Sequence, residues 1–95
     1  MKYPVAVWIT DGVYTAEVPD LPGVVTEADS MAELESAVKE AAAGWMECQS
    51  DSGNEIPLPA SVESHKNKEK YKGCNWLLAD LSFGEKADVV LDKSI

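Results

Sequence analysis

The sequence contains one long segment of helical periodicity, and this segment limits the folds open to the chain. It begins at Ser30, and Glu33, three residues later, completes the pattern of a capping box. In that motif the serine hydroxyl accepts from the Glu33 N–H, and the Glu33 carboxylate accepts from the serine N–H. An apolar stripe follows at helical spacing: Leu34, Val38, Ala41, Trp45 and Cys48. We expect a helix from Ser30 to about Gln49 or Asp51, with a sheet covering the stripe that one helix cannot bury alone.

A hairpin is predicted before the helix. Asp11-Gly12 separates two runs rich in β-branched and aromatic residues, expected as strands over residues 3–10 and 13–18 with a type I′ turn. If Thr10 pairs with Val13, one strand face is apolar except for a tyrosine hydroxyl: Val5, Val7, Ile9, Tyr14, Ala16 and Val18. The opposite face is mixed: Ala6, Trp8, Thr10, Val13, Thr15 and Glu17. The helix should therefore pack on the first face, leaving the second for water or a partner.

The remaining elements complete an α+β fold. Pro22-Gly23 has the chemistry of a type II turn, which leads into a third strand over residues 24–28. After the helix, residues 75–81 form an apolar run that fits a strand buried on both faces or lying beside the helix. The predicted architecture is a βββαβ sheet with one helix on one face. A domain of residues 1–82 is followed by a linker and short C-terminal strand in residues 83–95.

Residues 61–73 are polar and are interpreted as a mobile solvated loop, although a basic run of this kind is also a candidate phosphate contact. They contain half of all the lysines: Lys66, Lys68, Lys70 and Lys72. His65, the only histidine, lies in this loop and is expected to be solvated and without function. Cys48 and Cys74 are expected to be small buried or half-buried thiols rather than a disulfide or metal ligands.

Charge and length exclude several classes of protein. The chain has 95 residues, 17 acids, 8 lysines and no arginine, for a formal net charge of −9. Nucleic-acid binding depends largely on Lys and Arg, so the favoured electrostatic partner is a basic protein. No apolar run approaches the ~18 residues of a membrane span, and the N-terminus lacks a signal-peptide core, so a cytoplasmic location is expected. No pattern indicates a cofactor or a metal site.

Several proline-punctuated segments occur together in a specific order, and in this combination the chain resembles a HicB-family antitoxin. The segments are Met1-Lys2-Tyr3-Pro4-Val5, Val18-Pro19-Asp20-Leu21-Pro22-Gly23, the Ser-capped helix, Ile56-Pro57-Leu58-Pro59 and Trp76-Leu77-Leu78-Ala79-Asp80-Leu81. The resemblance implies a partial RNase H-like fold and self-association into a dimer or tetramer. It also implies binding to a small basic HicA-type mRNA interferase toxin, whose active site the antitoxin masks.

The resemblance leaves the C-terminal region open. Many members of the family carry a ribbon-helix-helix or helix-turn-helix module that represses their own operon. Residues 86–91 resemble the strand of a ribbon-helix-helix module, but its two helices are absent from this sequence, so the segment is interpreted as a remnant or the start of such a module. Alternation places Asp88 and Val90 on the groove-facing side, where they disfavour DNA. Operator DNA is therefore an unfavoured partner, with no DNA-binding residue assigned. The alternative for this strand is pairing with a second copy.

Three functions follow as hypotheses. The first is a toxin-neutralising protein whose toxin-binding residues are Trp8, Thr15 and Glu17 on the open sheet face, with Asp20 and Glu27 at its edge. The alternative for Trp8 is packing beneath the lysine-rich loop or in a self-interface. The second is a metal-dependent nuclease, which is disfavoured because the first strand holds no acid, so no catalytic residue is assigned. The third is an operon repressor, alone or with toxin; an orphan oligomer without a toxin is a further alternative.

Overall fold

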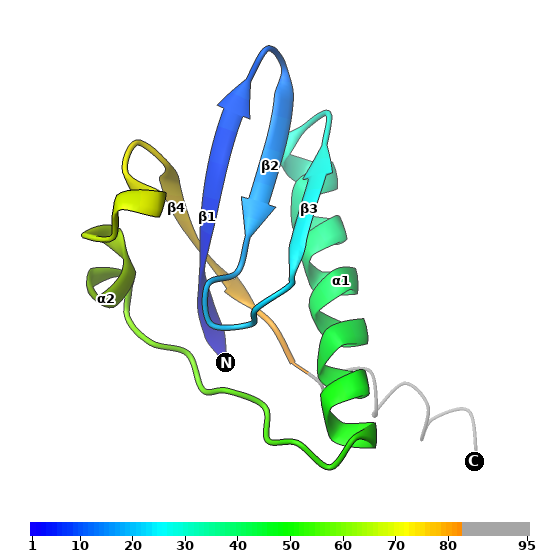
Figure 1. The fold of residues 1–95 in the computed structure, drawn as a ribbon. Helices are drawn as coiled ribbons and strands as arrows, with labels where there is room; N and C mark the ends of the chain where they lie inside the picture. The colour runs from blue at the N-terminus through cyan, green and yellow to red at the C-terminus, as the bar shows by residue number, and fades with distance from the viewer. Residues whose placement is uncertain (83–95) are drawn as a thin grey trace.

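The computed structural model describes residues 1–82, so the predicted strand over residues 87–91 lies outside the described residues. The elements, in chain order, are β1 (Lys2–Thr10), β2 (Val13–Glu17), β3 (Val25–Ala28), α1 (Met31–Asp51), α2 (Val62–Lys66), the 3-10 helix η1 (Glu69–Tyr71) and β4 (Asn75–Asp80). The strands form one antiparallel sheet in the order β3-β2-β1-β4, with α1 along one face (Figure 1). The predicted α+β architecture is confirmed. The division at residue 82 stays a prediction.

The hairpin forms in the predicted register. Thr10 pairs with Val13 and Ile9 with Tyr14, so the apolar face of both strands turns to one side. Asp11 and Gly12 have φ angles of 51° and 81°, the positive values that a type I′ turn requires at both central positions. The two-residue loop therefore fixes the register, and the register decides which side chains reach the core.

Local hydrogen bonds also fix the second turn and the start of α1. The Val24 N–H donates to the Leu21 carbonyl at 3.0 Å, and Gly23 between them has φ 102°, as the type II turn requires. The Ser30 hydroxyl accepts from the Glu33 N–H at 3.2 Å, as predicted. The Glu33 carboxylate, however, accepts from the Ser30 hydroxyl at 3.3 Å rather than from its N–H. The capping box is thus confirmed in one of its two bonds.

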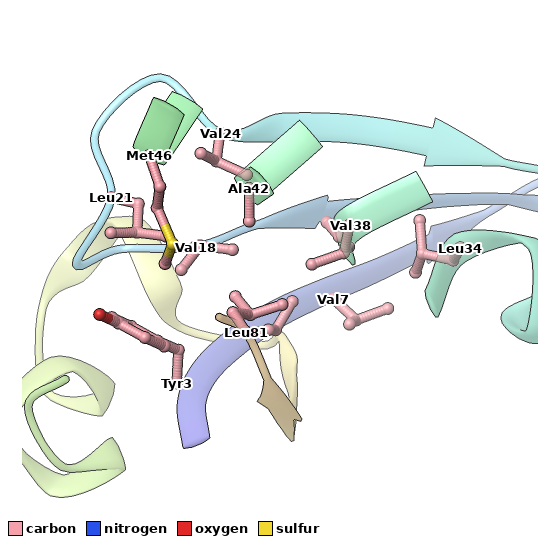
Figure 2. Packing of buried hydrophobic residues seen from close by; sticks show 12 residues of the cluster. Tyr3, Val7, Val18, Leu21, Val24, Leu34, Val38, Ala42, Met46 and Leu81 are labelled. Carbon is pink, nitrogen blue, oxygen red and sulfur yellow. The ribbon is translucent and has the colours of Figure 1, made fainter. Parts of the chain in front are cut away.

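The buried stripe of α1 differs from the prediction beyond Val38. Its fully buried residues are Leu34, Val38, Ala42 and Met46 (Figure 2). The predicted members Ala41 and Trp45 are only half-buried, and Cys48 is exposed. The observed spacing is four residues at every step. Side chains four residues apart form a row that is inclined to the helix axis, so the line of contact between α1 and the sheet crosses the strands obliquely. Opposite this row lie apolar residues of the sheet and its loops: Tyr3, Val5, Val7, Ala16, Val18, Leu21, Val24 and Leu81.

β4 lies at the edge of the sheet beside β1, and it is not buried on both faces. Leu77 and Ala79 pack against the core, whereas Leu78 between them is 55 % exposed. The strand therefore alternates like an ordinary edge strand. Of the two predicted alternatives, the doubly buried strand is wrong, and the strand instead lies beside α1, whose Glu35 and Lys39 line a hollow together with β4. None of the helices in residues 1–82 combines the length and apolar character needed to cross a membrane.

The second face of the sheet is partly covered by the chain itself. Residues 61–73, called here the cover segment, form α2 and η1 and the turns that join them, on the opposite side of the sheet from α1 (Figure 1). The Ser61 hydroxyl begins α2 by accepting from the Ser64 N–H at 3.2 Å. The lysines of this segment are exposed, as predicted, but its backbone forms two short helices and the side chains of His65 and Tyr71 are buried, so the interpretation as a loop is wrong.

Candidate functional site

The register brings together three of the five residues predicted as a binding site. Trp8 on β1 pairs with Thr15 on β2, and Thr15 pairs with Glu27 on β3. Paired residues point to the same side, so these three side chains form one row across the outer face, the face opposite α1. Glu17 stands in the next row, between Ala6 and Val25. Asp20 lies beyond the end of β2, in the turn before β3.

Aromatic rings of the cover segment and β4 close over part of this row. The ring centroid of Tyr71 lies 6.1 Å from that of Trp8, in a stacked arrangement, and 5.5 Å from that of Trp76, edge to face. The imidazole of His65 stacks on Trp76 at 6.3 Å. Trp8 therefore packs beneath the lysine-rich segment, the alternative that the sequence left open for it.

His65 is buried and joins the cover segment to the turn after β2. Its side chain is 7 % exposed, and its Nε2 lies 3.0 Å from Oδ1 of Asp20. Its Nδ1 lies 3.3 Å from Nζ of Lys68. A lysine ammonium can only donate, so Nδ1 accepts and Nε2 carries the proton that it donates to Asp20. The expectation that His65 is solvated is wrong: both ring nitrogens are engaged inside the protein, and neither is free to act as a catalytic base.

The carboxylates of Asp20 and Glu17 are both used within the molecule. Asp20 Oδ2 accepts from the Ala60 N–H at 3.1 Å, in addition to its contact with His65. Glu17 Oε2 accepts from the Tyr71 hydroxyl at 2.7 Å and lies 2.9 Å from Nζ of Lys70. Two effects raise the pKa of Tyr71 well above its ordinary value: burial of the phenol is the larger, and the hydrogen bond to Glu17 is the second. These contacts fasten the cover segment at two separate points.

The rest of the outer face stays open to solvent. We call it the open face, and it consists of five side chains on the hairpin and β3: Thr10, Val13, Thr15, Val25 and Glu27. Val25 is 57 % exposed and Val13 38 %. Within residues 1–82 the Glu27 carboxylate makes no hydrogen bond or ion pair, in contrast to Glu17 and Asp20. It is therefore the predicted site carboxylate that remains available to a partner.

A hollow of about 390 Å³ adjoins the open face where β3 meets the start of α1. Its lining combines three acids with three small apolar residues: Glu27, Asp29, Glu33, Val13, Ala28 and Ala37. Carboxylates around an apolar floor suit the long aliphatic stem and cationic head of Lys or Arg. Within residues 1–82, His, Cys, Asp and Glu side chains form no group placed to hold a metal ion. The lining of this hollow therefore has the chemistry that suits a cationic side chain.

Sequence reasoning missed the residues that build the outer-face cluster, namely His65, Tyr71 and Trp76. One indirect signal was present, because a sheet with a helix on one face and an exposed Trp8 on the other requires a cover. No local pattern states which part of the chain supplies it. The contacts that do so join residues 45 and 54 positions apart, Asp20 to His65 and Glu17 to Tyr71.

Comparison with known proteins adds family evidence to this geometry. The model of a family described as the HicB-like antitoxin of bacterial toxin-antitoxin systems matches residues 3–90. The fold is similar to the crystal structure of the N-terminal domain of the Burkholderia pseudomallei antitoxin HicB, with 31 % identity and a TM-score of 0.75, over 86 % of this chain and 99 % of that one. The structure of the Burkholderia pseudomallei antitoxin HicB is similar at 30 % identity and a TM-score of 0.78, over 90 % of this chain and 66 % of that one.

Two further relatives are more distant. A chain of a HicA3 and HicB3 toxin-antitoxin complex shares the fold at 20 % identity and a TM-score of 0.68, over 86 % of this chain and 99 % of that chain. A 14.9 kDa protein of the rep-hol intergenic region of Haemophilus phage HP1 is 29 % identical over 72 residues, which is 76 % of this chain. The chain spans about half the length of this curated relative, 54 %.

Proposed function

The chain belongs to the HicB-like antitoxin family, as its sequence resemblance predicted, and from this membership we propose that it neutralises a small basic HicA-type RNase toxin by masking the toxin's active site. The observation that carries the proposal is the family match over residues 3–90, together with a fold that spans nearly all of a HicB N-terminal domain. A chain of the same fold in a complex of HicA3 and HicB3 supports a HicA-type partner.

Electrostatics favours this kind of partner. A formal net charge of −9 on 95 residues produces a negative potential that attracts a cationic protein and raises its association rate. The same potential repels the phosphates of RNA and DNA. Once the partner is bound, the antitoxin would therefore keep RNA from the toxin surface by charge as well as by steric exclusion.

We propose the open face as the toxin contact. Thr15 and Glu27 are neighbours in the same cross-strand row, and Val13 and Val25 flank them as exposed apolar contacts. The acidic hollow beside Glu27 accepts a basic side chain of the toxin. Glu17 and Asp20 are predicted toxin contacts as well, but the toxin reaches their carboxylates only by replacing Lys70 and His65 of the cover segment.

The role proposed here is non-catalytic and cytoplasmic. Asp80, the acid that a nuclease hypothesis would test, accepts from the N-terminal ammonium of Met1 at 2.9 Å. The operon repressor and the orphan oligomer stay predictions. Both depend partly on residues 83–95, which lie outside the described residues.

The test is to purify this chain with the product of the neighbouring small basic reading frame and to measure complex formation by size exclusion with light scattering. The proposal expects a stable joint complex and loss of the partner's RNA cleavage when the chain is added. A partner that cleaves RNA equally well with the chain present would refute toxin neutralisation.

A charge reversal then tests the open face. Glu27→Lys is expected to weaken toxin binding by about tenfold or more, because it removes a recognition carboxylate and adds a like charge. Glu40→Lys on the exposed face of α1 is the matched control, since it changes the net charge equally. Equal losses for both variants would show that only long-range attraction matters and that the contact lies elsewhere.

Trp8→Ala, the variant suggested by sequence alone, is expected to fold and to bind toxin less well. Trp8 also stacks against Tyr71, so its loss disturbs the cover segment as well. Thr15→Lys separates the two effects, because Thr15 lies in the same row without a ring contact. Unchanged affinity in Trp8→Ala would remove Trp8 from the interface.

A further inference from the structure

Lys70 of the cover segment holds its ammonium against a carboxylate that belongs to the sheet. Its Nζ lies 2.9 Å from Oε2 of Glu17, the oxygen that also accepts from the Tyr71 hydroxyl at 2.7 Å. The side chain of Lys70 is 64 % exposed, whereas that of Glu17 is 17 % exposed. The carboxylate is thus largely covered, and its cationic partner is the member of the pair that faces solvent.

The other lysines of the cover segment use their ammonium groups differently. Lys66 and Lys72 each form an ion pair with a glutamate three residues away in the segment itself. Lys68 contacts the ring of His65, again within the segment. Of the four lysines in residues 61–73, Lys70 is therefore the one whose ion pair reaches the sheet.

Glu17 lies at the border of the open face. It pairs with Val25 across β2 and β3, and paired residues point to the same side of a sheet. Val25 belongs to the open face and is 57 % exposed. Thr15, another member, lies two residues before Glu17 on the same strand and therefore on the same side. A protein bound to the open face would have the Glu17 carboxylate at the edge of its contact.

We propose that Lys70 is an internal competitor of the toxin, occupying on Glu17 the place that a basic side chain of the toxin takes in the complex. This inference rests on the proposed toxin contact. The toxin cation replaces the Lys70 ammonium, while Tyr71 keeps its hydrogen bond to Glu17. An exposed ion pair is weak and a lysine side chain is flexible, so the exchange does not require the cover segment to open.

Asp20 shows the opposite arrangement. Its partner His65 has a side chain that is 7 % exposed and stacks on Trp76. No rotation of a surface side chain can free this carboxylate, so a toxin reaches Asp20 only after the cover segment has opened. The two predicted contacts therefore differ in access, and Glu17 is the one that a single lysine controls.

The competition should lower the affinity for the toxin. A site that is only partly available binds its ligand with an apparent Kd raised in proportion to the fraction that is blocked. Lys70 is held by its ion pair with Glu17 and by the ring of Tyr71, whose centre lies 5.7 Å from the ammonium. A partner that presents no cation at this position leaves both contacts in place and gains nothing from Glu17, so Lys70 also favours basic partners.

The test compares the toxin affinities of two variants of the full chain, Lys70→Met and Lys72→Met, by titration calorimetry. Both remove one positive charge and keep an apolar stem, and the two lysines are equally exposed, at 64 % and 65 %. Lys70→Met should bind about threefold to tenfold more tightly than Lys72→Met, because the toxin no longer displaces the ion pair and the ring contact. Equal affinities, or weaker binding by Lys70→Met, would overturn the proposal.

A second comparison asks whether Lys70 acts through Glu17. In the Glu17→Gln background, Lys70→Met and Lys72→Met should bind the toxin equally, and a gain that persists there overturns the proposal. Amide exchange of residues 61–73 should be the same in the two single variants. Faster exchange in Lys70→Met would assign its gain to opening of the cover segment and would also overturn the competition.

The proposed function and this inference can fail separately. If the toxin binds neither the wild type nor any variant, toxin neutralisation is refuted and the competition with it. If the wild type binds the toxin and Lys70→Met shows no gain over Lys72→Met, the competition alone is refuted. Circular dichroism of each variant checks that it remains folded.

Discussion

The two faces of the sheet are covered by different kinds of interaction. On one face α1 buries an unbroken row of apolar side chains, from Leu34 to Met46, against apolar strands (Figure 2). On the other, the cover segment is attached by stacked rings and by polar contacts of His65 with Asp20 and of Tyr71 and Lys70 with Glu17. The packing of α1 on the first face is stabilised by the amount of apolar surface that it removes from water. The packing of the cover segment on the second face is stabilised by contacts between a few specific side chains.

This difference implies two levels of stability in one small domain. The interface of α1 with the sheet has the dense apolar packing that resists local opening. The cover segment consists of short helices with exposed lysines, and it should open at a lower free energy than the sheet and α1. Opening would uncover Trp8 and the carboxylates of Glu17 and Asp20, the predicted toxin contacts that are engaged in the closed form.

The largest expected effect is at the α1 face. Leu34→Ala should lower the free energy of unfolding by about 3 kcal/mol, because Leu34 is fully buried and its loss leaves a cavity. Urea denaturation followed by circular dichroism measures the change. Ala32→Gly, at an exposed position of the same helix, controls for the helix itself and should cost about 1 kcal/mol. A loss in Leu34→Ala no larger than in this control would contradict the assignment of α1 as the main core element.

His65→Ala should destabilise the cover segment by about 2 kcal/mol, since it leaves the Asp20 carboxylate without its ring partner. The effect should be local. Amide exchange is expected to rise in residues 61–73, and tryptophan emission to shift to the red, while the urea transition followed by circular dichroism changes little. Lys66→Ala, on the exposed side of α2, is the control. Global destabilisation as large as in Leu34→Ala would show that the two faces form one cooperative unit.

Tyr71→Phe should cost about 1–2 kcal/mol in the same segment, because it removes the hydroxyl that donates to Glu17 and keeps the ring stacked on Trp8. Amide exchange of residues 61–73 measures the loss. Tyr14→Phe on β2 controls for removal of a hydroxyl elsewhere in the sheet. Equal exchange in wild type and Tyr71→Phe would indicate that ring stacking alone holds the segment.

The same tyrosine predicts an alkaline transition. The pKa of Tyr71 is raised on folding, so the folded protein holds the phenolic proton more tightly than the unfolded chain does. Its contribution to stability is complete below the ordinary value of 10.0 and is lost as pH rises towards the folded pKa. During an alkaline titration followed by tyrosine absorbance and amide exchange, the cover segment should open at a lower pH than the sheet and α1. In Tyr71→Phe this opening should depend less on pH, and the remaining dependence should come from Tyr3 and Cys74, whose pKa values are raised mainly by burial.

The smallest effect concerns Gly44 in α1. A Cβ at this position meets nothing within 4 Å, so the glycine is merely tolerated and close packing does not require it. Gly44→Ala should therefore stabilise the protein by about 0.5–1 kcal/mol through helix propensity. Gly23→Ala is the contrast and should destabilise it, because φ there is 102°. Destabilisation by Gly44→Ala would point to a contact that the helix makes with a partner.

The predictions that succeeded used local chemistry. Asp11-Gly12, Pro22-Gly23 and Ser30 each fix a backbone conformation within a few residues, and strand alternation then assigned the two faces of the hairpin. Along α1 the predicted positions Ala41 and Trp45 each lie one residue before the buried Ala42 and Met46, because periodicity gives a face but not the angle at which a helix crosses a sheet. The grouping of Trp8, Thr15 and Glu27 came from alternation and adjacency in the sheet. Their role in toxin binding stays a prediction.

By itself, the sequence determined the order of strands and helix, the hairpin register, the apolar face and the family. Each follows from turn chemistry, from a period of two or 3.6 residues, or from a combination of motifs. Only the tertiary structure decided that residues 61–73 return to cover Trp8, that His65 is buried against Asp20 and that Glu27 stays free. These outcomes rest on single contacts between residues far apart in the chain, and a polar segment rich in lysine carries no periodic signal of the surface it will meet.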